Sequence, residues 1–134
     1  GGEGTRLRPL TCDCPKPMIR LMNRPVMQYA LALLKKHGVT QIAATLGYLP
    51  DAIMDYFGDG EAFGVDLRYY VEKTPMGTAG GVKQAAGFLD ETFAVLSGDG
   101  VTDLDEYRQG RDPRTAAVSD ASGQLNLRVL TPLE

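Results

Sequence analysis

Residues 41–72 read QIAATLGYLPDAIMDYFGDGEAFGVDLRYYVE, and this stretch decides the fold class. It opens at 41–47 with a short, mostly apolar segment that is typical of a strand buried on both faces of a parallel sheet. The next residues predict a short helix from about Pro50 to Phe57, closed by Gly58, and residues 65–72 predict another strand. A strand, a helix and a strand joined by short links indicate a βαβ unit.

The same alternation extends in both directions along the chain. Residues 23–39 predict a helix with Pro25 in its first turn and Gly38 as its stop; its apolar residues recur at helical spacing, at Val26, Ala30, Leu33 and Leu34. Residues 77–89 predict a helix of small residues that Thr78 caps, and residues 92–100 predict a strand that ends in a polar loop. We therefore expect an α/β fold with a doubly wound sheet, helices on both faces, and ligands at the carboxyl ends of the strands.

The pattern changes near the C-terminal end of the chain. Residues 114–130, RTAAVSDASGQLNLRVL, contain two strand-like segments around a DASG turn. Two such segments joined by a short turn are typical of a β-hairpin rather than another βαβ unit. We therefore expect a C-terminal β-hairpin.

Length and composition limit the classes of function. The chain has 134 residues, about one domain, with 43% apolar and 23% charged residues, which is ordinary for a soluble globular protein. No apolar run approaches the roughly 18 residues that span a bilayer, and no charged-then-apolar leader stands at the start, so we expect a cytoplasmic protein without a membrane partner. Cys12 and Cys14 are too closely spaced for a usual zinc pair, and His37 falls where the first helix should end.

The charge of the chain is unevenly distributed. The net charge is −3, but residues 1–24 carry +3 and the remainder carries −6. A positive segment beside glycines suits a small polyanion better than a nucleic acid, which usually requires a basic domain with interleaved aromatic residues. We therefore expect no nucleic-acid partner.

That positive segment begins with a glycine-rich stretch, GGEGTRLRPLT at residues 1–11. Leu7 stands where G-x-G-x-x-G requires glycine, and no G-K-[ST] follows, so neither a dinucleotide fold nor a P-loop NTPase is predicted. A flexible N-terminal tail is the alternative to a ligand loop. A ligand loop would offer close backbone approach, a hydroxyl and guanidinium groups, at Gly1, Gly2, Gly4, Thr5, Arg6 and Arg8.

Three further elements point to phosphate chemistry, although each has an ordinary alternative. Lys16 lies between two prolines in PKPM, which stiffen the chain around a compact charge; the alternative is a surface lysine. Asp99 in VLSGDG follows an apolar strand and is well placed to hold Mg²⁺, but GDG is also a common turn. The stretch TPMGTAGG is a glycine-rich entry to a helix, whose free N–H groups at Gly77 and Thr78 could meet a base, a ribose or a phosphate.

In this order and spacing, the segments GGEGTRLRPLT, PKPM, NRPVMQYAL, GTAGG and SGDG resemble the sugar-1-phosphate nucleotidylyltransferases over roughly residues 1–107. TCDCPKPM and YLPDAIMDYFGDG look most like the mannose-1-phosphate guanylyltransferases; glucose-1-phosphate enzymes that use dTTP or UTP are near neighbours. The resemblance implies a Rossmann-like three-layer sandwich with a mixed, mainly parallel sheet. It also implies transfer of a nucleotidyl group from a nucleoside triphosphate to a sugar 1-phosphate, with GTP and GDP-mannose expected for this chain.

The resemblance also implies residue roles. Arg6 and Lys16 would bind phosphates as the catalytic residues, and Asp99 would bind the Mg²⁺ cofactor. The nucleotide would lie against the glycine-rich stretch and the helix entry, at Gly1, Gly2, Gly4, Gly77 and Thr78, with Thr5 supporting the loop. The partners would be a nucleoside triphosphate and a sugar 1-phosphate, and a homo-oligomer of the full-length protein is compatible with this interpretation.

The sequence departs from the family pattern at three places. Family members begin with a buried strand that runs directly into GGxGTR, so we expect the first strand to be missing and the chain to be a fragment. Between Tyr107 and Arg111 the family usually has another helix and strand, and TPLE stands where a Glu-Lys-Pro stretch contacts the sugar phosphate. We therefore expect a partial domain, with a nucleotide-binding half at 1–107 and a remnant of the sugar-phosphate half at 111–134. The alternative is a nucleotide-binding or regulatory homologue without catalysis.

Overall fold

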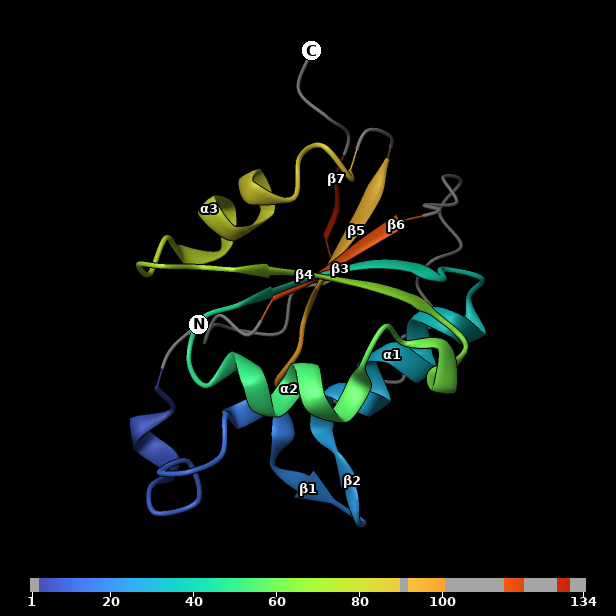
Figure 1. Cartoon of the computed structure of the whole chain (residues 1–134). Coiled ribbons are helices and arrows are strands. Elements are labelled where there is room, and N and C mark those ends of the chain that lie inside the picture. Colours follow the sequence, from blue (N-terminus) through green and yellow to red (C-terminus); the bar gives the residue numbers. More distant parts are fainter. Residues whose placement is uncertain (1–2, 90–91, 101–114, 120–127, 131–134) are drawn as a thin grey trace.

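The structure of the chain is a computed structural model that describes residues 3–89, 92–100, 115–119 and 128–130 (Figure 1). Within these ranges the elements follow the order η1 (Thr5–Leu7), η2 (Lys16–Met18), β1 (Arg20–Leu21), β2 (Arg24–Pro25), α1 (Val26–Lys36), β3 (Gln41–Leu46), α2 (Pro50–Phe57), η3 (Glu61–Phe63), β4 (Asp66–Val71), α3 (Gly77–Gln84), β5 (Phe93–Ser97), β6 (Thr115–Ser119) and β7 (Arg128–Leu130). The predicted helices and strands up to residue 100 are all present. His37 is the C-cap residue of α1, as its place in the sequence indicates.

The main sheet has the strand order β4-β3-β6-β5-β7. Strand β3 is parallel to both β4 and β6, and β5 is parallel to β6. Strand β7 is antiparallel to β5 at the edge of the sheet. The prediction of a mixed, mainly parallel sheet is confirmed. A separate two-stranded antiparallel sheet joins β1 and β2.

Helices cover both faces of the sheet, with α3 on one side and α1 and α2 on the other (Figure 1). The division follows the two-residue repeat of the strands, because successive side chains point to opposite faces. On β3, Ile42 and Ala44 pack in the cluster that contains the buried residues of α1 and α2. Ala43, between them, packs with Ala85 and Leu89 at and beyond the end of α3. The predicted three-layer, Rossmann-like sandwich is therefore confirmed.

The predicted C-terminal β-hairpin is wrong. Both strands exist, but β6 lies between β3 and β5 and is parallel to each, whereas β7 pairs with the far side of β5. The physical reason is the number of backbone hydrogen bonds that each arrangement allows. All five residues of β6 are in register with both neighbours, whereas a hairpin would pair β6 with only the three residues of β7.

The predicted cap of α3 is also wrong. Met76 is the N-cap residue, no side chain caps the helix, and Thr78 lies inside the first turn. The Met76 N–H donates to Oε2 of Glu72 at 3.3 Å, so a carboxylate just beyond β4 serves this end of the helix. Gly77 has a positive φ of 68°, a conformation that glycine adopts without strain.

None of the helices in the described part of the chain has both the length and the apolar character that crossing a membrane requires.

The packing between α1 and the sheet yields a stability prediction. Leu34 is fully buried in the cluster that joins α1, α2 and the sheet. We expect Leu34→Ala to lower the free energy of unfolding by about 2–5 kcal/mol, because the cavity adds to the lost transfer free energy. Urea denaturation of the 134-residue chain measures the change. Lys36→Ala, at an exposed position of the same helix, is the control and should change it by less than about 0.5 kcal/mol.

Candidate functional site

Two residues that the sequence singled out separately lie in direct contact. Nζ of Lys16 is 2.7 Å from Oδ2 of Asp99, and only 6% of the Asp99 side chain is exposed, against 32% for Lys16. Burial of a carboxylate is costly unless a counter-charge or hydrogen bonds compensate it. The Lys16 ammonium supplies that counter-charge, so the pair is an electrostatic unit and not a chance surface contact.

The flanking prolines hold Lys16 in place. Pro15 and Pro17 are both buried. Lys16 lies between them and is the first residue of the short 3₁₀ helix η2. The Met18 N–H donates to the Pro15 carbonyl at 2.8 Å, which closes the turn, and η2 packs against both α1 and α2. The backbone of Lys16 is therefore fixed by the core, whereas its side chain is partly exposed and its ammonium contacts Asp99.

Ser97 completes this cluster and was missed by the sequence analysis. It is the last residue of β5, and its hydroxyl donates to Oδ1 of Asp99. Each carboxylate oxygen of Asp99 thus has its own partner, with Ser97 on one and Lys16 on the other. The signal was present in the sequence, because Ser97 stands two residues before Asp99 at the end of an apolar strand.

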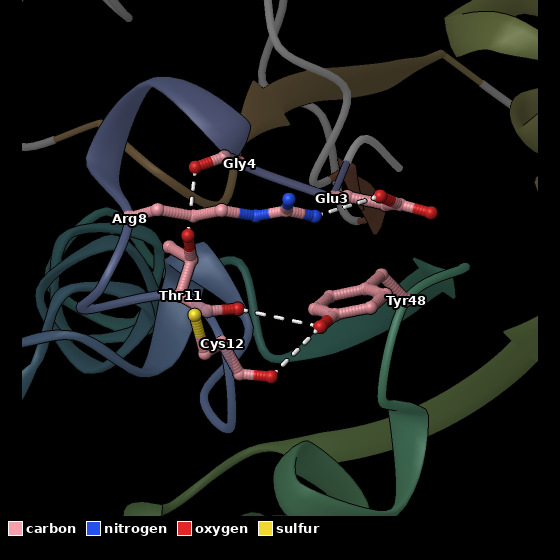
Figure 2. Close-up of polar contacts among 6 residues, drawn as sticks. All are labelled: Glu3, Gly4, Arg8, Thr11, Cys12 and Tyr48. Carbon is pink, nitrogen blue, oxygen red and sulfur yellow. Dashed lines mark hydrogen bonds and ion pairs between the residues drawn. The ribbon is translucent and has the colours of Figure 1, made fainter.

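The glycine-rich stretch folds back on itself (Figure 2). Gly4 has a positive φ of 61°, and a Cβ there would lie 2.9 Å from Cγ2 of Thr11, so both conformation and space favour glycine. The Thr11 hydroxyl donates to the Gly4 carbonyl at 2.7 Å, which closes the loop. Thr5 and Arg6 follow in η1 and are exposed, so their side chains remain accessible to a ligand.

The rest of the basic segment differs in how its charges are paired. Arg8 forms an exposed ion pair with Glu3, with Nη2 and Oε2 3.2 Å apart, as Figure 2 shows. Arg6 makes no ion pair with any residue that the structure describes. Of the two arginines Arg6 and Arg8, it is therefore Arg6 whose guanidinium is open to a phosphate.

Tyr48 connects this loop to the sheet. It stands two residues beyond the end of β3, and its hydroxyl donates to the carbonyls of Thr11 at 3.3 Å and Cys12 at 3.0 Å (Figure 2). Since β3 and β5 run in the same direction through β6, Tyr48 and Asp99 lie beyond the same edge of the sheet. The loop and the Lys16–Asp99 pair therefore lie at the edge of the sheet that the carboxyl ends of its parallel strands form, which is where an α/β fold binds its ligands.

Gly77 and Thr78 follow a different strand of the sheet from Asp99. Both are exposed at the start of α3, which follows β4. Strands β3 and β6 separate β4 from β5, so with neighbouring strands about 4.8 Å apart the two strand ends are roughly 14 Å apart. They share one edge of the sheet, and only an extended ligand would reach both.

The remaining predicted site residues, Gly1 and Gly2, lie outside the described residues. Asp103 and Asp105, the next two aspartates after Asp99 in the sequence, are alternative metal ligands and also lie outside the described residues. Within the described ranges, no group of three or more His, Cys, Asp and Glu side chains is arranged to hold a metal ion. Asp99 is therefore a single-carboxylate candidate.

Cys12 and Cys14 are both free thiols. Burial raises the pKa of the Cys14 thiol above its usual range, and the Arg20 guanidinium opposes this effect only in part. A raised pKa disfavours the thiolate that binds metals or acts as a nucleophile.

The family model described as nucleotidyl transferase matches residues 1–120. The chain belongs to the nucleotidyl transferase family.

Curated relatives of this chain differ in the base and the sugar that their names give. It is 42% identical to a UTP–glucose-1-phosphate uridylyltransferase of Synechocystis sp., with 78% of this chain and 30% of the relative covered. It is 36% identical to a D-glycero-alpha-D-manno-heptose 1-phosphate guanylyltransferase of Campylobacter jejuni, with 78% and 47% covered. It is 38% identical to a mannose-1-phosphate guanylyltransferase of Mycobacterium tuberculosis, with 78% and 30% covered. The chain thus spans about a third to a half of these relatives.

Solved structures support the same family assignment. A putative glucose-1-phosphate thymidylyltransferase from Bacillus anthracis in complex with sucrose matches with a TM-score of 0.72 and 28% identity, over 81% of this chain and 44% of that one. HddC from Yersinia pseudotuberculosis complexed with GMP-PN matches with a TM-score of 0.68 and 32% identity, over 78% and 47%. The residues matched by the family model, 1–120, include both Lys16 and Asp99.

The Lys16–Asp99 contact predicts a stability effect that a purely ligand-binding lysine would not have. We expect Lys16→Ala to lower the free energy of unfolding by about 1–3 kcal/mol, because it leaves the nearly buried carboxylate without its counter-charge. Adding Asp99→Asn should recover most of that loss, since it removes the buried charge. A double-mutant cycle by urea denaturation measures the coupling. Additive effects of the two substitutions would contradict the pairing.

Proposed function

We infer that the protein transfers a nucleotidyl group from a nucleoside triphosphate to a sugar 1-phosphate and releases pyrophosphate. The carrying observation is the Lys16–Asp99 pair beside the glycine-rich loop, in a chain that belongs to the nucleotidyl transferase family. A cationic group and a carboxylate suited to a divalent cation are what the chemistry of a triphosphate requires. The nucleotide-binding half is residues 1–107 in this proposal, and the protein acts in the cytoplasm.

The fit of Mg²⁺ to the site rests on the partners of Asp99. A cation, the Lys16 ammonium, already lies 2.7 Å from Oδ2, so the position beside this oxygen is suited to positive charge. Mg²⁺ is commonly held by one or two carboxylates together with substrate phosphates, which matches a single carboxylate at the end of β5. When bound there, Mg²⁺ would neutralise charge on the phosphoryl oxygens.

The roles of the side chains follow from this arrangement. An oxygen of the sugar phosphate attacks the α-phosphorus, and the bond from that phosphorus to the pyrophosphate oxygen breaks, so pyrophosphate leaves. Arg6 and Lys16 compensate the negative charge on the phosphoryl oxygens. To do so, the Lys16 ammonium leaves the Asp99 carboxylate and pairs with a phosphate oxygen. The backbone of Gly1, Gly2 and Gly4 approaches the nucleotide, Thr5 supports that loop, and Gly77 and Thr78 contact the base or sugar. No covalent protein intermediate is needed.

For the substrates we propose GTP and mannose 1-phosphate, giving GDP-mannose. Guanylyltransferase names recur among the relatives, including the mannose-1-phosphate enzyme of Mycobacterium tuberculosis and the heptose 1-phosphate enzyme of Campylobacter jejuni. Because the relative from Synechocystis sp. is a uridylyltransferase, UTP and glucose 1-phosphate are the competing pair of substrates to test.

The metal assignment is tested by nucleotide binding. We expect the chain to bind GTP more tightly with Mg²⁺ than without it, and Asp99→Asn to weaken Mg²⁺-dependent binding about ten- to hundredfold, the value of one charge-assisted contact. Isothermal titration with GTP, UTP, dTTP and ATP, with and without Mg²⁺, measures both effects. Asp66→Asn, an exposed carboxylate at the start of β4 on the opposite edge of the sheet, is the control. Unchanged Mg²⁺ dependence in Asp99→Asn would move the metal to Asp103 or Asp105.

Turnover is tested by pyrophosphate release with mannose, glucose and heptose 1-phosphates. We expect Arg6→Ala to lower kcat/KM about ten- to hundredfold with little change in melting temperature, because Arg6 is exposed and its loss leaves no described ion pair broken. Arg24→Ala, an exposed arginine on β2, should leave kcat/KM unchanged. If the full-length protein binds GTP but no sugar phosphate gives pyrophosphate, the protein is a nucleotide-binding homologue without catalysis.

A further inference from the structure

The glycine-rich loop lacks the packing that usually holds a binding loop in one shape. Between residues 3 and 12, Thr11 is the one buried residue, and η1 contains none. Most of the loop's backbone hydrogen bonds are local turns, from Leu7 to Gly4, Leu10 to Leu7 and Cys12 to Pro9. Local turns define a shape but do not attach it to the protein, and the exposed Arg8–Glu3 pair adds little.

One side chain makes that attachment. Among the described residues, the hydroxyl of Tyr48 makes the only hydrogen bonds that join residues 3–12 to a residue outside the loop. Tyr48 is itself firmly anchored, since it stands between the buried strand β3 and helix α2. Leu49, the next residue, turns the chain into α2 with a positive φ of 47°. The tyrosine therefore presents its hydroxyl from a rigid part of the fold.

Thr11 relays this attachment to the front of the loop. Its main-chain carbonyl accepts from Tyr48, and its side-chain hydroxyl donates to the Gly4 carbonyl. Figure 2 shows Thr11 linked to both other residues, with its hydroxyl toward Gly4 and its carbonyl toward Tyr48. Gly4 is thus held from the sheet through two successive polar contacts.

We propose that Tyr48 and Thr11 are positioning residues that hold the glycine-rich loop in its nucleotide-binding shape. The proposal rests on the proposed function for what the loop binds, but the tether itself does not depend on a ligand. A loop held in this way loses less conformational freedom when its N–H groups meet a phosphate, so the tether increases affinity without touching the nucleotide. Neither residue belongs to the set that contacts substrate.

The first test uses the 134-residue chain without any ligand. We expect Tyr48→Phe, which keeps the ring and removes the hydroxyl, to speed amide hydrogen exchange at Leu7, Leu10 and Cys12, with the melting temperature close to that of the parent. Tyr29→Phe is the matched control, because its hydroxyl also donates to a carbonyl, that of Leu21 at 2.8 Å, away from the loop. Equal exchange in Tyr48→Phe, Tyr29→Phe and the parent chain would overturn the proposal.

The second test measures the consequence for binding. We expect the Kd for GTP with Mg²⁺ to rise about three- to tenfold in Tyr48→Phe, the effect of one neutral hydrogen bond, and to stay unchanged in Tyr29→Phe. Thr11→Val, an isosteric loss of the hydroxyl, should give a similar rise, and Thr11→Ser, which keeps the hydroxyl, should restore binding. The two losses should be less than additive in Tyr48→Phe combined with Thr11→Val, because they break one chain of contacts.

The outcomes separate this proposal from the proposed function. Faster loop exchange with an unchanged Kd would overturn the positioning role while leaving nucleotide binding intact. If Tyr48→Phe speeds loop exchange but the parent chain binds none of the four nucleotides, the proposed function is overturned and the tether alone is established.

Discussion

Four parallel strands that end at one edge of the sheet are the constraint on which the candidate site depends. The first residues after each strand lie at that edge, which puts Tyr48 beyond β3, Glu72 beyond β4 and Asp99 beyond β5. The register of β3 and β5 is fixed by burial on both faces, since a one-residue slip would turn every side chain to the opposite layer. Such a slip would also move Asp99 away from Lys16. The core packing and the polar edge are therefore set by the same register.

The charges at this edge are balanced before any ligand arrives. A carboxylate that is 6% exposed is stabilised by an ammonium group and a hydroxyl, so the protein tolerates a buried charge. In the proposed function, a metal–triphosphate complex offers each member of the pair a new partner of opposite sign at the same moment. An anion alone or a cation alone would compensate only one member and leave the other without a partner. This electrostatic relation favours binding of the two together.

The structure holds its two phosphate-facing segments in different ways. Lys16 stands on a backbone that two buried prolines anchor in the core, next to α1 and α2. The glycine-rich loop, by contrast, is exposed and is attached through hydroxyl-to-carbonyl contacts at Tyr48 and Thr11. Polar attachments of this kind hold the shape of an exposed segment without burying it, whereas the lysine owes its position to packing in the core.

By itself, the sequence determined the three α-helices and strands β3, β4 and β5, because apolar spacing, proline at helix starts and glycine at helix ends act within a few neighbouring residues. It also singled out Lys16 and Asp99 as phosphate and metal candidates, each from its own local motif. Only the tertiary structure decided that these two residues touch, that Ser97 and Tyr48 complete the site, that Glu72 rather than Thr78 serves the start of α3, and that β6 enters the sheet between β3 and β5 instead of forming a hairpin. The physical reason is that local signals record a segment's own conformational preference, whereas strand order and side-chain contacts depend on where distant segments find the most backbone hydrogen bonds and compensating charges.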